Sequence, residues 1–115
     1  MRFSLLAFAI SGLLAAPAFA DECPGSKIAG AEFHGLWRVR IDIDAGTWDG
    51  SSKDGRHITG DVKVTCDGSK VTMQTSNKSD GNDCTYILNR RGRSIEGNLT
   101  CSKNGGVTDF HGMFQ

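Results

Sequence analysis

The feature that most constrains the fold of this chain is the alternation of polar and apolar residues in short runs from residue 35 to the C-terminus. Clusters of Gly, Asp, Asn and Ser separate these runs, as expected for half-buried antiparallel strands joined by turns. No stretch of useful length has the periodicity of an amphipathic helix, and residues 28–32 are compatible with a turn. The alternation predicts an all-β meander of six strands, at residues 35–43, 57–66, 69–76, 84–90, 94–101 and 107–114.

A two-residue turn at Asp67-Gly68 is expected to join the second and third strands, because such a turn requires positive φ. This turn would place Val64 opposite Val71. The apolar side chains of both strands then share one face, and the polar side chains between them face solvent.

The cysteine count is even, which in a short exported chain favours two disulfides over metal or thiol chemistry. No C-x-x-C pair is present, so a structural zinc site is the weaker alternative. The four cysteines are Cys23, Cys66, Cys84 and Cys101.

A turn at residues 92–93, with Gly at its first central position, would join the fourth and fifth strands and place Cys84 opposite Cys101. Directly opposed residues have Cβ atoms about 4.5–5.5 Å apart, which is close to the separation in a disulfide. We therefore expect a Cys84–Cys101 bridge, and by elimination Cys23 pairs with Cys66.

A pattern of apolar, any, Gly, any, apolar residues occurs four times, centred on Gly35, Gly60, Gly97 and Gly112. Glycines on the inward face of a strand permit the bends that a small barrel needs. In meander order the segment 110–114 could pair beside 37–41 and close the sheet. A closed or nearly closed barrel is therefore expected, with an open sheet curled over one core as the alternative.

The N-terminal segment has the pattern of a cleavable secretory signal peptide: Met1-Arg2, an apolar run, and the small-residue exit Ala18-Phe19-Ala20. We expect cleavage of residues 1–20, an N-terminal segment 21–33 tied down by a disulfide, and one barrel domain over 34–115. The mature protein would be periplasmic or secreted. No second apolar run follows, so no stable membrane insertion is expected after cleavage.

Composition and motifs argue against several functions. The 13 basic residues balance the 13 acidic ones, so no nucleic-acid partner is expected. No triad or paired-carboxylate motif indicates an enzyme, and no catalytic residue is assigned. His34 and His111 could approach one another, and two loops rich in Asp, Asn and Ser could bind calcium, but exposed strand and turn positions explain these residues as well. No metal or cofactor is therefore expected.

Trp48 is the residue that most suggests a binding role, because it falls in a stretch rich in Gly and Asp, next to Asp49, that we expect to be a loop. An aromatic side chain there either folds back onto the core or contacts a partner. Arg91 and Arg93 form a small basic group at the expected 92–93 turn, where they could bind an anionic group. These four residues are the candidate partner-binding residues.

Gly35-Leu36-Trp37 opens the first expected strand, and this G-x-W start resembles that of the calycin barrels, which include lipocalins and avidins. A similar start occurs in some bacterial secreted inhibitors of proteases. The chain also resembles short exported bacterial proteins of unknown function that combine an early G-L-W with later paired cysteines. The calycin resemblance implies that Trp37 plugs one end of a barrel, and it transfers no site residues.

The sequence favours a non-catalytic binding module for an unknown protein or glycan. One alternative is an inhibitor of a secreted hydrolase, such as a protease or a lysozyme. The other is a carrier of a small ligand, although six short strands are expected to leave an interior filled by side chains.

Overall fold

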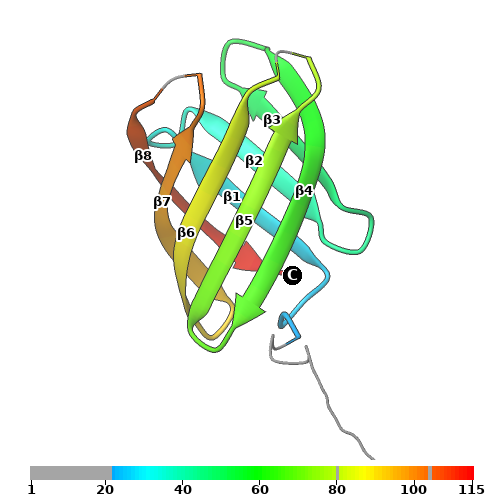
Figure 1. Ribbon diagram of the computed structural model, residues 1–115, viewed down its shortest axis with the longest axis vertical. Helices are drawn as coiled ribbons and strands as arrows, with labels where there is room; N and C mark the ends of the chain where they lie inside the picture. The colour runs from blue at the N-terminus through cyan, green and yellow to red at the C-terminus, as the bar shows by residue number, and fades with distance from the viewer. Residues whose placement is uncertain (1–21, 80, 104) are drawn as a thin grey trace, which may run out of the picture.

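Eight antiparallel strands follow one another around a closed barrel in the computed structural model, which describes residues 22–79, 81–103 and 105–115 (Figure 1). Each strand pairs with the next in sequence, and β1 pairs with β8 to close the sheet. The strands are β1 Lys27–Glu32, β2 Trp37–Asp42, β3 Thr47–Ser52, β4 His57–Asp67, β5 Lys70–Asn77, β6 Asp83–Arg91, β7 Ser94–Cys101 and β8 Val107–Phe114.

The expected all-β meander and its closure are confirmed, but two of the strands were missed. Strand β1 lies where a turn was expected, because its central residues Ala29, Gly30 and Ala31 give no apolar alternation. Strand β3 lies in the stretch expected to be a loop. Its Asp, Gly and Ser residues are ordinary turn formers, and pairing with β2 and β4 on both sides overrides that preference.

The additional strand β1 changes how the barrel closes. Strand β8 pairs with β1, with Gly112 opposite Gly30, and not with β2 as expected. The barrel therefore begins at Lys27, within the N-terminal segment 21–33 that was expected to precede it. Closure leaves none of the eight strands with an unpaired edge.

The hairpin between β6 and β7 has the expected register, with Cys84 opposite Cys101. The hairpin between β4 and β5 is shifted by two residues, so that Val64 lies opposite Met73 and not Val71. The turn residues are Gly68 and Ser69, because Gly68 takes the positive φ of 60°. A shift of two residues keeps every side chain on its face, so the predicted inward set was unaffected.

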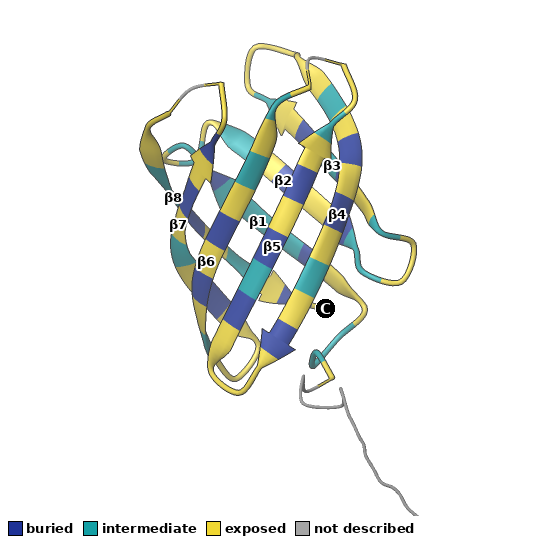
Figure 2. Ribbon diagram, viewed as in Figure 1, coloured by how far each residue is buried: buried dark blue, intermediate teal, exposed yellow. Residues whose placement is uncertain are grey.

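Buried and exposed residues alternate along the strands, which produces the banding in Figure 2. The inward side chains form one core, and Tyr86 packs edge-to-face against Phe110 with ring centroids 5.3 Å apart. The most buried large side chains are Tyr86, Phe110, Phe114, Ile28, Met73, Leu88, Ile95 and Leu99.

Three of the four patterned glycines lie in strands, at positions where the backbone of a neighbouring strand approaches closely. A Cβ atom on Gly60 would stand 2.2 Å from the Ser76 carbonyl oxygen, and one on Gly97 would stand 2.2 Å from that of Ile87. Gly35 is the exception, because it lies in the turn between β1 and β2 with a φ of 84° and open space around it.

Both expected disulfides are present. Cys23–Cys66 ties the segment before β1 to the end of β4, and Cys84–Cys101 joins the paired strands β6 and β7 with Cα atoms 4.0 Å apart. Two disulfides are consistent with an oxidising compartment outside the cytoplasm. The expected signal peptide lies outside the described residues, among which no helix is long and apolar enough to cross a membrane.

Candidate functional site: a polar cavity at one end of the barrel

A cavity of about 320 Å³ opens at the end of the barrel where the β1–β2, β3–β4, β5–β6 and β7–β8 connections lie; we call it the mouth. One part of its wall is aromatic, and the β5 and β6 side is polar. The lining residues are Glu32, Phe33, Trp37, Trp48, Arg56, Ile58, Thr75, Asn77, Asn82, Cys84 and Cys101.

Glu32, the last residue of β1, is buried among the core side chains with only 4% of its surface exposed. Its Oε1 atom accepts a hydrogen bond of 2.6 Å from the Tyr86 hydroxyl. No basic side chain within the described residues forms an ion pair with it. Buried carboxylates are normally paired with a cation or several donors, so this group is under-compensated.

Burial raises the pKa of Glu32 to about 7. The hydrogen bond from Tyr86 opposes the rise, and the negative charge of Asp109 adds to it. Burial also raises the pKa of Tyr86, and the neighbouring Glu32 carboxylate raises it further. The phenol therefore stays protonated and donates to Glu32, whereas the Glu32 carboxyl changes its charge near neutral pH.

Trp48 forms part of the inner wall of the mouth, with 8% of its surface exposed. Its indole ring covers Gly50, where a Cβ atom would stand 2.5 Å from the ring. The Nε1 atom is sealed from solvent and makes no hydrogen bond of normal geometry within the described residues. It nevertheless lies near enough to the Tyr86 hydroxyl to oppose the rise in the pKa of that group.

The turn between β1 and β2 holds Phe33 at the mouth in a backbone conformation that side chains rarely adopt. Phe33 and His34 have φ angles of 54° and 56°. Asp109 of β8 fixes this turn by accepting a 2.9 Å hydrogen bond from the His34 backbone N–H and lying 3.2 Å from His34 Nδ1. Such strain is kept where a particular placement is needed, and here it accompanies the position of Phe33 in the wall of the cavity.

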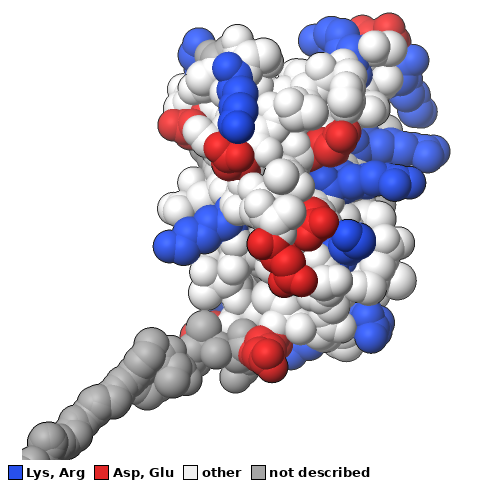
Figure 3. Space-filling view, turned by 90° about the vertical axis from the view of Figure 1, so that its right-hand side faces the viewer, with Lys and Arg blue, Asp and Glu red and all other residues white. Residues whose placement is uncertain are grey.

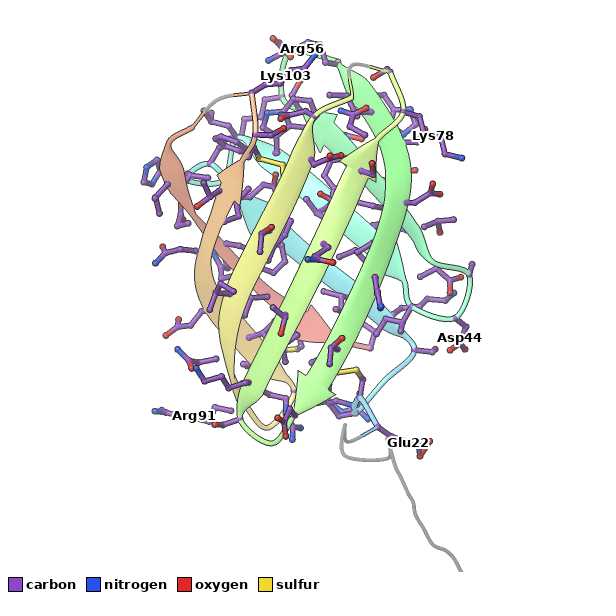
Figure 4. The ribbon with its side chains drawn as sticks, in the orientation of Figure 1. Glu22, Asp44, Arg56, Lys78, Arg91 and Lys103 are labelled. Carbon is purple, nitrogen blue, oxygen red and sulfur yellow. A yellow bond between two sulfur atoms is a disulfide. The ribbon has the colours of Figure 1, made fainter. Side chains whose placement is uncertain are left out.

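At the rim, the Arg56 guanidinium lies over the ring of Trp37, 5.2 Å from its centroid. Its Nε atom also lies 3.3 Å from Oδ1 of Asp54, and both side chains of this pair are about two-thirds exposed. Arg56 therefore contributes a paired, solvated charge at the entrance. Figure 4 shows Arg56 with Lys78 and Lys103 at this end of the molecule.

The polar side of the mouth comes from the ends of β5 and the loop that follows. Thr75 is buried, and Asn77 and Asn82 are half-buried. The Asn77 Oδ1 atom accepts a 2.9 Å hydrogen bond from the Ser79 N–H, and Asn82 Oδ1 accepts one of the same length from Lys103 N–H. These bonds hold the loops that border the cavity.

The structure places only one of the four candidate partner-binding residues in the mouth. Trp48 lies in β3 and packs inward, one of the two placements considered for it. Asp49, its neighbour, binds His57 at 2.7 Å. Arg91 and Arg93 lie at the β6–β7 turn, at the opposite end of the barrel from Arg56, as the label of Arg91 shows (Figure 4).

Sequence reasoning did not identify Glu32 as a site residue. An acidic residue at an inward position of a barrel strand is the pattern that reveals it. That pattern was hidden because β1 itself was not recognised.

Neither metal hypothesis gains support from the geometry. Within the part of the chain that the structure describes, no three His, Cys, Asp or Glu side chains are grouped to hold a metal ion. On the face shown in Figure 3, several basic side chains gather along the right-hand side, and acidic side chains lie next to them.

No protein-family model matches the chain, and neither a curated protein nor a solved structure matches it.

Proposed function

We propose that this protein is an exported, non-catalytic binding protein that holds one small polar molecule in the mouth of its barrel. The observation that carries the proposal is the under-compensated Glu32 carboxyl in a cavity bordered by three aromatic side chains. Burial of an acidic group in a largely apolar barrel core destabilises the fold. A ligand that binds this group would explain why the chain keeps it there.

The size and lining of the mouth support a small ligand. Its volume of about 320 Å³ is at the lower end of the range for small-molecule sites. Such sites combine apolar walls with a few polar groups, and they occur in the mouths of β-barrels. Below the mouth the barrel is filled by side chains, so the ligand would sit at the end of the barrel and not along its axis.

Binding is favoured over catalysis because the lining offers too few reactive groups. Among the described lining residues, Glu32 is the single carboxyl, and both cysteines are joined in a disulfide. General acid–base chemistry or nucleophilic attack needs a second positioned group. The partner-protein and inhibitor alternatives lose their most distinctive residue, because Trp48 is not on an exposed loop.

Nuclear magnetic resonance offers a direct test, because the chain has two tryptophans and both line the mouth. A library of molecules with up to about 15 non-hydrogen atoms would be titrated into the oxidised, ¹⁵N-labelled mature protein. We expect a bound fragment to shift the indole N–H signals of Trp37 and Trp48 while the amide signals of Gly68 and Gly92, in turns at the opposite end, stay in place.

Two variants sharpen this test. Trp37→Ala removes one aromatic wall and should weaken binding, whereas the double variant Arg91→Ala/Arg93→Ala changes exposed side chains at the other end and should bind normally. The proposal is wrong if no fragment moves the indole signals, or if the fragments that bind shift the 92–93 turn instead.

A further inference from the structure

Resting on the proposed function, we infer that the ligand is a small organic ammonium ion, whose charged head pairs with the Glu32 carboxylate between the aromatic walls of the mouth. Three features of the mouth favour such a ligand: the free side of the Glu32 carboxyl, the aromatic lining and the placement of Arg56.

The Glu32 carboxyl has room for a second partner. Tyr86 donates to Oε1, and no hydrogen bond within the described residues reaches Oε2. Trp48 Nε1 is sealed from solvent and has no hydrogen-bond partner. Oε2 of Glu32 also lacks a partner within the described residues, but it is not sealed from solvent. Oε2 is therefore open to the cavity, where a ligand that donates hydrogen bonds and carries positive charge can reach it.

The aromatic walls suit the same chemistry. Phe33, Trp37 and Trp48 border the cavity on the side of strands β1 to β3. Aromatic faces attract cations, and rings grouped around a cavity are the usual means of holding an organic ammonium group. A carboxylate at the floor adds the countercharge that such a group needs in a partly dehydrated site.

The mouth already holds one cation against an aromatic face, because the Arg56 guanidinium covers the ring of Trp37. Arg56 is neutralised by Asp54 and largely exposed, so it does not compensate Glu32 from the rim. The charge that remains unpaired inside is negative. A cationic ligand would correct this imbalance, and an anionic ligand would increase it.

Binding should then depend on the protonation of Glu32, whose pKa lies at about 7 in the empty protein. The groups facing it are Tyr86 from β6, which stays protonated, and Asp109 from β8, whose pKa is lowered by the backbone N–H of His34 and which stays charged. His34 Nδ1 lies 3.2 Å from Oδ1 of Asp109, and Arg56 is paired with Asp54 at the rim. The affinity for a cation should fall about tenfold for each pH unit below the pKa of Glu32.

Isosteric probes test the charge of the ligand. The first set is benzylammonium, benzyl alcohol and benzoate, and the second is choline with its neutral analogue 3,3-dimethylbutan-1-ol. Each would be titrated into the oxidised mature protein at about pH 8 and about pH 6, with the indole signals of Trp37 and Trp48 as readout. We expect the cation of at least one set to bind about tenfold or more tightly than its neutral isostere at the higher pH, and to lose affinity at the lower pH.

The variant Glu32→Gln keeps the shape of the side chain and an acceptor for Tyr86 but removes the charge. It should abolish the preference for the cation and its pH dependence, while the exposed control Glu96→Gln on β7 should retain both. A folded Glu32→Gln protein that still prefers the cation overturns the inference.

Failure of the inference is distinguishable from failure of the proposed function. If in neither set the cation binds at the mouth more tightly than its uncharged or anionic counterpart, or if a library fragment binds there and no cationic probe does, the site binds ligands but the ammonium inference is wrong. If neither the library nor any probe moves the indole signals, both proposals are wrong.

Discussion

Glu32 makes the folded barrel sensitive to pH at the level of a single residue. Burial raises the pKa of this carboxyl to about 7, from an ordinary value near 4.5. Between these values the folded protein keeps a proton that the unfolded chain releases, so folding binds a proton. The contribution of the protonated Glu32 carboxyl to the unfolding free energy is therefore complete below the ordinary pKa, and it is lost as the pH rises through about 7.

We expect Glu32→Gln to make the protein more stable than the parent at about pH 8 and nearly equal to it at about pH 4. The amide oxygen can still accept the Tyr86 hydrogen bond, and no buried charge forms at high pH. The difference in unfolding free energy should reach about 3 kcal/mol, at about 1.4 kcal/mol per pKa unit. Urea unfolding across this pH range measures it.

Glu96→Gln serves as the control, because it makes the same chemical change on the exposed face of β7. It should leave the pH profile of the unfolding free energy unaltered. A Glu32→Gln variant that is less stable than the parent at high pH would show that the carboxylate stabilises the fold. The residue would then be structural, and the argument for a ligand would lose its main support.

At the scale of the strands, the sequence predicted those elements whose alternation is unambiguous. The β6–β7 hairpin was predicted with its register, because Gly92 supplies the positive φ of the turn and Cys84 and Cys101 fall opposite one another. Strands β1 and β3 could not be recognised locally. Their small and polar residues form strands because neighbours on both sides provide hydrogen bonds, and this information is not contained in either segment alone.

The mouth was predictable only in part, for the same reason. Trp48 was identified as a notable aromatic, but its inward direction depends on the pairing of β3. Glu32 and Phe33 meet at the end of β1, and the left-handed φ of Phe33 is not signalled by its residue type. Two residues of the cavity wall, Glu32 and Trp48, therefore lie on strands that the alternation did not reveal.

Close backbone approach in the strands gives a second expected outcome. Gly97→Ala in β7 should lower the unfolding free energy by about 1–3 kcal/mol, because the new Cβ would stand 2.2 Å from the Ile87 carbonyl oxygen, a backbone atom that cannot easily move. Gly106→Ala, where no atom lies within 4 Å of the position of a new Cβ, is the matched control and should change stability by less than about 0.5 kcal/mol. Equal effects in thermal unfolding would mean that Gly97 is not needed for close strand packing.

At the scale of the whole molecule, the two disulfides brace different parts of the barrel. Cys84–Cys101 lines the mouth and joins adjacent strands, whereas Cys23–Cys66 ties the segment before β1 to the far end of β4. Their sequence separations are 17 and 43 residues. A longer closed loop restricts the unfolded chain more, so Cys23–Cys66 should contribute more to stability.

Replacing each pair by alanine should separate stability from ligand binding. In the loop-entropy treatment, loss of Cys23–Cys66 costs about 4 kcal/mol of unfolding free energy and loss of Cys84–Cys101 about 3 kcal/mol.

The variant without Cys23–Cys66 keeps β1 paired with β2 and β8, so below its unfolding temperature its mouth should remain intact and bind as in the parent. The second alters the wall of the cavity itself, so it should bind more weakly although it is the more stable of the two variants. Denaturant unfolding measures the order of stability of the two variants, and fragment titration of the indole signals measures their order of ligand affinity. Weaker binding by the Cys23–Cys66 variant alone would place the ligand site away from the mouth.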